Sequence, residues 1–240
     1  MEITKIIPTV NFKYDANATT KTEEGLSALI TTAITNYGTT ELEVFDTVFR
    51  YSPFVTLIDN ADTAILSNIT NIKISKTFTP TLASALKYTI SFSNAFYNPH
   101  SGHAADTTGT IPGGILSSTG FTLTDDANTY YLEDDGAGNV NAYYISGAAK
   151  VYKTPSVGTI DYTTGDVVLT KMNFATVGDV DGATSTVIRL TVQPASNDIV
   201  PVRNQILQID ATNLSVTGTV DTIAAGAGDA GVNYTTSATY

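Results

Sequence analysis

The sequence predicts a mainly β protein of the α+β class, in which a small strand and helix region is followed by an antiparallel β-rich region. Two observations lead to this fold class. Residues 1–80 combine strand-like segments with a clear helical pattern, whereas residues 81–216 hold short alternating segments between polar turns. We therefore predict an α/β region at 1–80, a β-rich domain at 81–216 and a polar low-complexity tail at 217–240.

The first region opens with a strand-like segment at residues 5–14 and continues with the best helical pattern in the chain. Apolar side chains recur there at helical spacing: Leu26, Leu29, Ile30, Ala33 and Ile34. Thr22, followed by Glu23 and Glu24, favours a helix start, because a hydroxyl and acidic side chains stabilise free N–H groups. Gly38 predicts a left-handed helix end.

A second, shorter helix is expected after a further strand. Residues 41–49 have the β-branched and aromatic content of a strand. Ser52 and Pro53 then predict an N-cap followed by proline at the first helical position, with a helix over residues 52–60. Residues 69–78 alternate as a strand, so the expected order is strand, helix, strand, helix, strand.

The β-rich region contains a series of short strands. They are expected at residues 86–98, 121–124, 129–132, 140–145, 151–153, 159–162, 166–169 and 185–193. Thr164 and Gly165 join two of them as a hairpin turn. The end of the chain, from Ala224, has little that could enter a core, so we expect it to be disordered or ordered only against a partner.

Composition excludes several function classes. Lys and Arg number 12 against 23 Asp and Glu, a formal net charge of −11, which is the wrong sign for binding nucleic acid. No apolar window is long enough for a membrane helix, and the N-terminus lacks the pattern of a signal peptide, so we expect a soluble, unprocessed protein. The absence of cysteine excludes disulfides and thiolate sites and suits synthesis in a reducing cytosol.

The candidate chemical sites each have a simpler explanation. His100 and His103 could face one metal ion, but no acidic group completes a site, so an exposed loop is favoured. The run from Asp179 to Gly182 begins like a calcium loop but lacks the later glutamate, which favours a turn. Asp161 and Asp166 could pair for glycoside hydrolysis, yet hairpin spacing does not establish this. We predict no enzyme activity, no metal and no cofactor.

Two stretches resemble an adhesive surface instead. Residues 45–62 gather aromatic and aliphatic side chains around Arg50, and residues 201–210 interrupt an apolar run with polar groups. The alternative for Arg50 is a surface side chain whose stem packs on aromatics. The candidate interface residues are Phe49, Arg50, Tyr51, Phe54, Leu57, Arg203, Asn204 and Gln205.

Three motifs together resemble a known family. They are VFRYSPFVTLIDNADTAILSNIT at residues 48–70, GTIDYTTGDVVL at 158–169, and NDIVPVRNQILQID at 197–210 with a terminal GVNYTTSATY. In this order they resemble the carboxy-terminal part of the large baseplate wedge protein of T-even-like contractile-tailed phages, a family similar to the baseplate J proteins. Family members are much longer, with an amino-terminal region absent here.

The resemblance implies a virion structural protein located in the baseplate of the phage tail. It implies a homodimer that joins other baseplate wedge proteins, so that successive wedges close a ring around the tail hub. Such a ring needs an isologous contact and a second, different contact. The alternative function is a carbohydrate- or receptor-binding β module of a virion, with Tyr130, Tyr131, Tyr143 and Tyr144 stacking on sugars. A carboxylate-using hydrolase is a third, less favoured interpretation.

Overall fold

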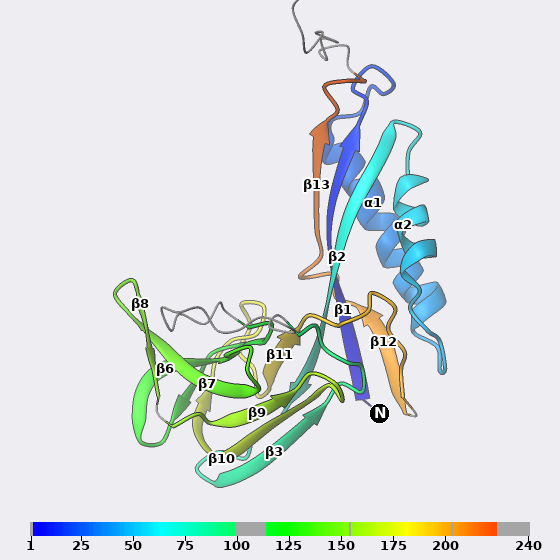
Figure 1. Cartoon of the computed structure of the whole chain (residues 1–240). Coiled ribbons are helices and arrows are strands. Elements are labelled where there is room, and N and C mark those ends of the chain that lie inside the picture. Colours follow the sequence, from blue (N-terminus) through cyan, green and yellow to red (C-terminus); the bar gives the residue numbers. More distant parts are fainter. Residues whose placement is uncertain (1, 99–113, 154, 203, 225–240) are drawn as a thin grey trace, which may run out of the picture.

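The computed structural model describes residues 2–98, 114–153, 155–202 and 204–224, which form two lobes (Figure 1). One lobe is a sheet with helices on one face, and the other is a small antiparallel barrel. Strands dominate both lobes, so the predicted fold class, α+β and mainly β, is confirmed.

The sheet of the first lobe joins strands from both ends of the chain. Its order is β12-β1-β2-β11-β4, and β13 also pairs with β1. β1 is antiparallel to β2 but parallel to β12 and β13, which follow one another along the same strand. The strands are β1 (Glu2–Tyr14), β2 (Ile65–Phe78), β4 (Ser117–Ser118), β11 (Ile188–Val192), β12 (Gln205–Ile209) and β13 (Ser215–Val220).

Three helical segments cover one face of this sheet: α1 (Glu23–Tyr37), η1 (Gly38–Leu42), which is π-helical, and α2 (Tyr51–Asp59). α1 packs on β13 and α2 on β2. The predicted helical stripe is confirmed at Leu26, Ile30 and Ile34, which are fully buried. Thr22 is the N-cap, as predicted, and its Oγ1 accepts a hydrogen bond from the Gly25 N–H at 3.2 Å.

The predicted position of the end of α1 is confirmed, since α1 ends at Tyr37 with Gly38 as its C-cap, but the predicted left-handed conformation and the strand after it are wrong. Gly38 has a right-handed φ of −54° and continues into η1. Glycine at this position instead permits close packing, because a Cβ on Gly38 would come within 2.9 Å of Ile209 Cγ1. Residues 41–49 form no strand beyond a single bridge from Phe49 to Ile199. β12 already occupies that edge of β1, beside η1.

The start of α2 also differs from the prediction. Arg50 is at the N-cap position and Tyr51 begins the helix, so Pro53 falls in its first turn rather than at its first position. The Tyr51 N–H donates to Asp198 Oδ1 at 2.9 Å, across 147 residues of sequence. A cap supplied from so far away leaves no local sequence signal.

The second lobe is built from seven strands. They are β3 (Ala85–Ser91), β5 (Phe121–Leu123), β6 (Asp126–Asp134), β7 (Asn139–Ser146), β8 (Ala149–Tyr152), β9 (Gly158–Asp161) and β10 (Asp166–Val177). The pairings β10-β5-β6-β7-β9-β10 close a ring, while β3 adds to β10 and β8 to β7. The predicted hairpin through Thr164 and Gly165 is confirmed between β9 and β10.

The two lobes do not correspond to consecutive parts of the sequence. β11, β12 and β13 return to the sheet of the first lobe after the barrel is complete. The predicted region boundaries, 1–80, 81–216 and 217–240, remain a prediction. The predicted strand at 185–193 corresponds to β11, whereas β13 had no counterpart in the sequence analysis. The end of the predicted tail, from residue 225, lies outside the described residues.

Candidate assembly interface

The two aromatic residues at the centre of the first stretch pack inside the chain. Phe49 and Phe54 have no exposed surface, and their ring centres are 5.0 Å apart. Tyr37 of α1 contacts both rings, with ring centres 6.3 and 5.6 Å away. These rings join α1 and α2, so their direct role is to stabilise the first lobe.

Arg50 lies at the surface beside this cluster. Its Nη1 is 2.8 Å from Asp198 Oδ2, and its side chain is 60% exposed. The pKa of Asp198 is lowered, first by the hydrogen bond from the Tyr51 N–H and then by the Arg50 guanidinium. An exposed pair of this kind adds little stability by itself. Arg50 therefore remains available to a partner surface.

The other two candidate residues of the first stretch, Tyr51 and Leu57, are half-buried. The hydroxyl of Tyr51 donates to the main-chain oxygen of Thr70 at 2.8 Å, which fixes α2 on β2. Leu57, two residues before the end of α2, is partly exposed.

The second stretch anchors the start of β12. Arg203 lies outside the described residues. Asn204 is exposed, has a left-handed φ of 73°, and accepts a hydrogen bond from the Glu2 N–H at 3.1 Å. Gln205 is 3% exposed, and its Nε2 lies 3.3 Å from Glu2 Oε2. Gln205 therefore serves the lobe itself, whereas Asn204 is exposed.

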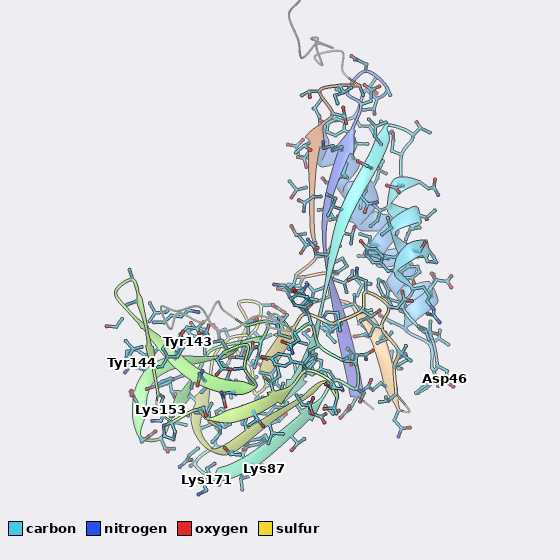
Figure 2. All side chains as sticks on the ribbon, viewed as in Figure 1. Asp46, Lys87, Tyr143, Tyr144, Lys153 and Lys171 are labelled. Carbon is cyan, nitrogen blue, oxygen red and sulfur yellow. The ribbon has the colours of Figure 1, made fainter. Side chains whose placement is uncertain are left out.

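The structure brings the first stretch to the segment just before the second. Phe49 and Ile199 exchange two main-chain hydrogen bonds of 3.0 Å. Four exposed apolar residues flank this bridge in the sequence, and we call them the apolar rim: Val44 (54% exposed), Phe45 (62%), Val200 (50%) and Val202 (42%). None was among the candidate residues. Phe45 begins the first stretch, and its neighbour Asp46 is exposed on the first lobe (Figure 2).

The chemical alternatives find little support where the structure describes them. Asp161 accepts main-chain hydrogen bonds from Thr163 and Thr164, and Asp166 accepts one from the Thr164 hydroxyl, so both carboxylates serve the hairpin turn. Asp181 is paired with Arg189 at 2.7 Å. His100 and His103 lie outside the described residues.

The described residues contain neither a metal-binding cluster nor a membrane-spanning helix. No group of three or more His, Asp or Glu side chains there has the geometry to hold a metal ion. Among the same residues, no helix has the length and apolar character needed to span a bilayer.

Of the four tyrosines of the sugar-binding alternative, one is buried and three are half-buried. Tyr130 is 2% exposed and meets Tyr144 edge to face, with ring centres 5.5 Å apart. Tyr131 and Tyr143 pair across β6 and β7 at 5.8 Å, and Tyr143 continues to Tyr152 of β8 at 5.9 Å. Figure 2 shows Tyr143 and Tyr144 on the barrel lobe, far from Asp46.

Comparison with known proteins supports the structural interpretation of the first lobe. Residues 3–77, about a third of the chain, match the family model described as baseplate structural protein gp6, C-terminal domain III. This segment is similar to that baseplate domain. It runs from β1 to the end of β2 and includes the first of the three motifs. A search of curated proteins found no match.

The match confirms the resemblance to a baseplate wedge protein. The gp6 description is structural, so the chain has a structural role and a location in the tail baseplate of a phage virion. Other baseplate components are its expected neighbours. The motifs at 158–169 and 197–210 lie outside the matched segment.

Proposed function

We propose that this chain is a wedge component of a contractile-tail baseplate, which self-associates as a homodimer and joins other wedge proteins in the ring around the tail hub. The observation that carries the proposal is the gp6 match over residues 3–77. A closed ring of repeated wedges needs contacts that propagate around an axis, in addition to any two-fold contact. The proposal assigns no enzyme activity, cofactor or nucleic acid to the chain.

The apolar rim is the part of the surface best suited to such a contact. Phe45 and Val202 expose apolar area, and the guanidinium of Arg50 lies in the same part of the chain. Aromatic and Arg side chains are enriched at the centres of protein interfaces. Among the candidate residues, Arg50, Leu57 and Asn204 have the exposure that a contact needs, whereas Phe49 and Phe54 support them from within.

Sedimentation velocity across a concentration series tests this assignment. The variant Phe45→Ser with Val202→Ser should shift the distribution toward monomer, because it removes apolar area from the rim. Ile69→Ser is the matched control, since Ile69 is 70% exposed on β2 and lies outside the rim. Equal self-association in both variants and the parent chain would exclude the rim, and a monomeric parent chain would exclude self-association.

A second candidate function has one observation in its favour. Tyr131, Tyr143 and Tyr152 form a row across three strands, and Tyr152 is 47% exposed. A row of aromatic faces suits stacking on sugar rings, which would make the barrel a carbohydrate- or receptor-binding module. Binding of the chain to a glycan array, lost in Tyr152→Ala, would favour this function.

A further inference from the structure

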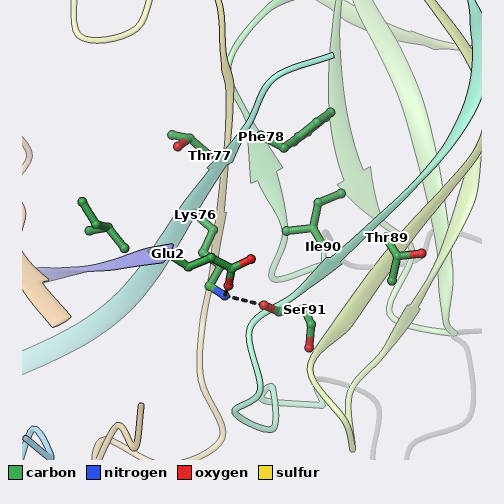
Figure 3. Close-up of a pocket in the computed structure, with 8 residues that line it drawn as sticks. Glu2, Lys76, Thr77, Phe78, Thr89, Ile90 and Ser91 are labelled. Carbon is green, nitrogen blue, oxygen red and sulfur yellow. Dashed lines mark hydrogen bonds and ion pairs between the residues drawn. The ribbon is translucent and has the colours of Figure 1, made fainter. Parts of the chain in front are cut away.

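Lys76 places a nearly buried ammonium group where the two lobes meet (Figure 3). Its side chain is 5% exposed. Nζ donates to Glu2 Oε2 at 2.9 Å and to the main-chain oxygen of Ser91 at 2.5 Å. Glu2 is in β1, Lys76 in β2 and Ser91 in β3, so one charge holds strands of both lobes. The ring centre of Phe92 lies 5.9 Å from the same nitrogen.

The charge of Lys76 is only partly compensated within the described residues. An ammonium group can donate three hydrogen bonds, and two of them have acceptors here. Its carboxylate partner, Glu2, is 71% exposed and therefore keeps much of its own hydration. A buried cation is costly unless it is well paired. A further anion beside Nζ would consequently be stabilised.

A pocket of about 300 Å³ opens beside this ammonium group. Its lining includes the apolar residues Ile3, Phe78 and Ile90 and the hydroxyl-bearing residues Thr77, Thr89 and Ser91. Glu2 and Lys76 are the charged residues of the lining. A water molecule takes about 30 Å³ of liquid volume, so the space suits a ligand of several heavy atoms. Apolar side chains beside a few charged and polar groups can fix the orientation of a ligand in such a pocket.

We propose that this pocket binds a carboxylate, with its oxygens beside Lys76 Nζ and its aliphatic part against Phe78 and Ile90. The carboxylate can belong to a small free acid or to a glutamate side chain of a neighbouring polypeptide, since both present the same chemistry. Glu2 is then an internal competitor for the same ammonium group. The proposal does not depend on self-association of this chain.

Chemical-shift titration of the isotope-labelled full chain tests the proposal. The two ligands are glutarate, as the free acid, and the peptide N-acetyl-Gly-Glu-Gly-amide, with the corresponding Gln peptide as matched control. Shifts should be confined to amides around Lys76, Phe78 and Ser91, and the Gln peptide should cause none. Binding by glutarate alone or by the Glu peptide alone would identify the source of the carboxylate. No shift with either ligand would overturn the proposal.

Two variants make the test specific. Lys76→Met should bind at least about tenfold more weakly, because the ligand loses a charge-assisted hydrogen bond. Glu2→Gln should bind more tightly, because the competing carboxylate is gone, and the amide oxygen of Gln can still accept a hydrogen bond from Lys76 Nζ in the folded chain. Unchanged affinity in Glu2→Gln, or equal shifts with inorganic phosphate, would show that Lys76 forms no carboxylate site.

Discussion

At the scale of single residues, Asp198 explains why the predicted start of α2 was wrong. Its Oδ1 receives the Tyr51 N–H, and its Oδ2 lies 2.8 Å from Arg50 Nη1. One carboxylate therefore starts α2 and neutralises the arginine that had suggested an interface. Ser52 and Pro53, the local cap signal, lie inside the helix instead.

Replacing Asp198 should weaken the fold in a pH-dependent way. Its pKa lies below the ordinary 3.8, so its stabilising effect is present above that value and is lost as pH falls through the lower folded value. We expect Asp198→Ala to lower the urea midpoint near neutral pH, and Asp198→Asn to lower it less, because the amide oxygen still accepts the Tyr51 N–H. In strong acid the Asp198→Asn difference should vanish, whereas the Asp198→Ala difference should shrink but persist, because a protonated carboxyl group still accepts the Tyr51 N–H. A constant difference at all pH values would contradict this role of the charge.

At the scale of elements, the packing of α1 on β13 depends on a glycine. The Gly218 N–H donates to Glu23 Oε1 at 2.7 Å, which joins the last described strand to the first turn of α1. A Cβ at Gly218 would come within 2.5 Å of Phe12 Cζ and 2.8 Å of Glu23 Cγ. Phe12 is 1% exposed, so its ring has little room to move.

Gly218→Ala should therefore destabilise the protein by about 1–3 kcal/mol, the usual cost of overpacking a buried site. Gly25→Ala is the matched control within α1, because a Cβ there meets nothing closer than 3.6 Å. Alanine in a helix should stabilise by about 0.5–1 kcal/mol relative to glycine. Urea unfolding of both variants measures the two effects, and equal effects would contradict the close packing at β13.

At the scale of the whole molecule, the segment that matches the gp6 family is not a self-contained sheet. β1 pairs with β12 and β13 along one edge, and β2 pairs with β11, and all three partners follow residue 187. Leu207 of β12 and Val192 of β11 belong to the core of the chain. The strands that complete the first lobe thus follow the barrel strands in the sequence.

A fragment of residues 1–80 should consequently fail to fold cooperatively. Without β11, β12 and β13 it leaves sheet edges unpaired and apolar surface uncovered. We expect poor dispersion in its amide NMR spectrum and no sharp thermal transition, in contrast to the full chain. Addition of a peptide covering residues 185–224 should restore dispersion. A fragment that unfolds as sharply as the full chain would support the predicted boundary at residue 80.

The sequence by itself determined the features that depend on near neighbours. The buried stripe of α1, its Thr22 cap and the turn at Gly165 were predictable because spacing and turn chemistry act over a few residues. The first motif likewise pointed to the baseplate family that residues 3–77 match. The mainly β class followed from the many short alternating segments.

Tertiary contacts determine which residues of the first stretch, 45–62, lie in the core and which lie at the surface. Phe49 and Phe54 look the same in sequence as the exposed Phe45, yet both are buried because Tyr37 and Ile199 approach from distant segments. The cap from Asp198, the close approach at Gly38 and the charge of Lys76 beneath Glu2 also join residues far apart in the chain. Contacts between distant segments determine which of these side chains are buried, and local sequence patterns do not predict such contacts.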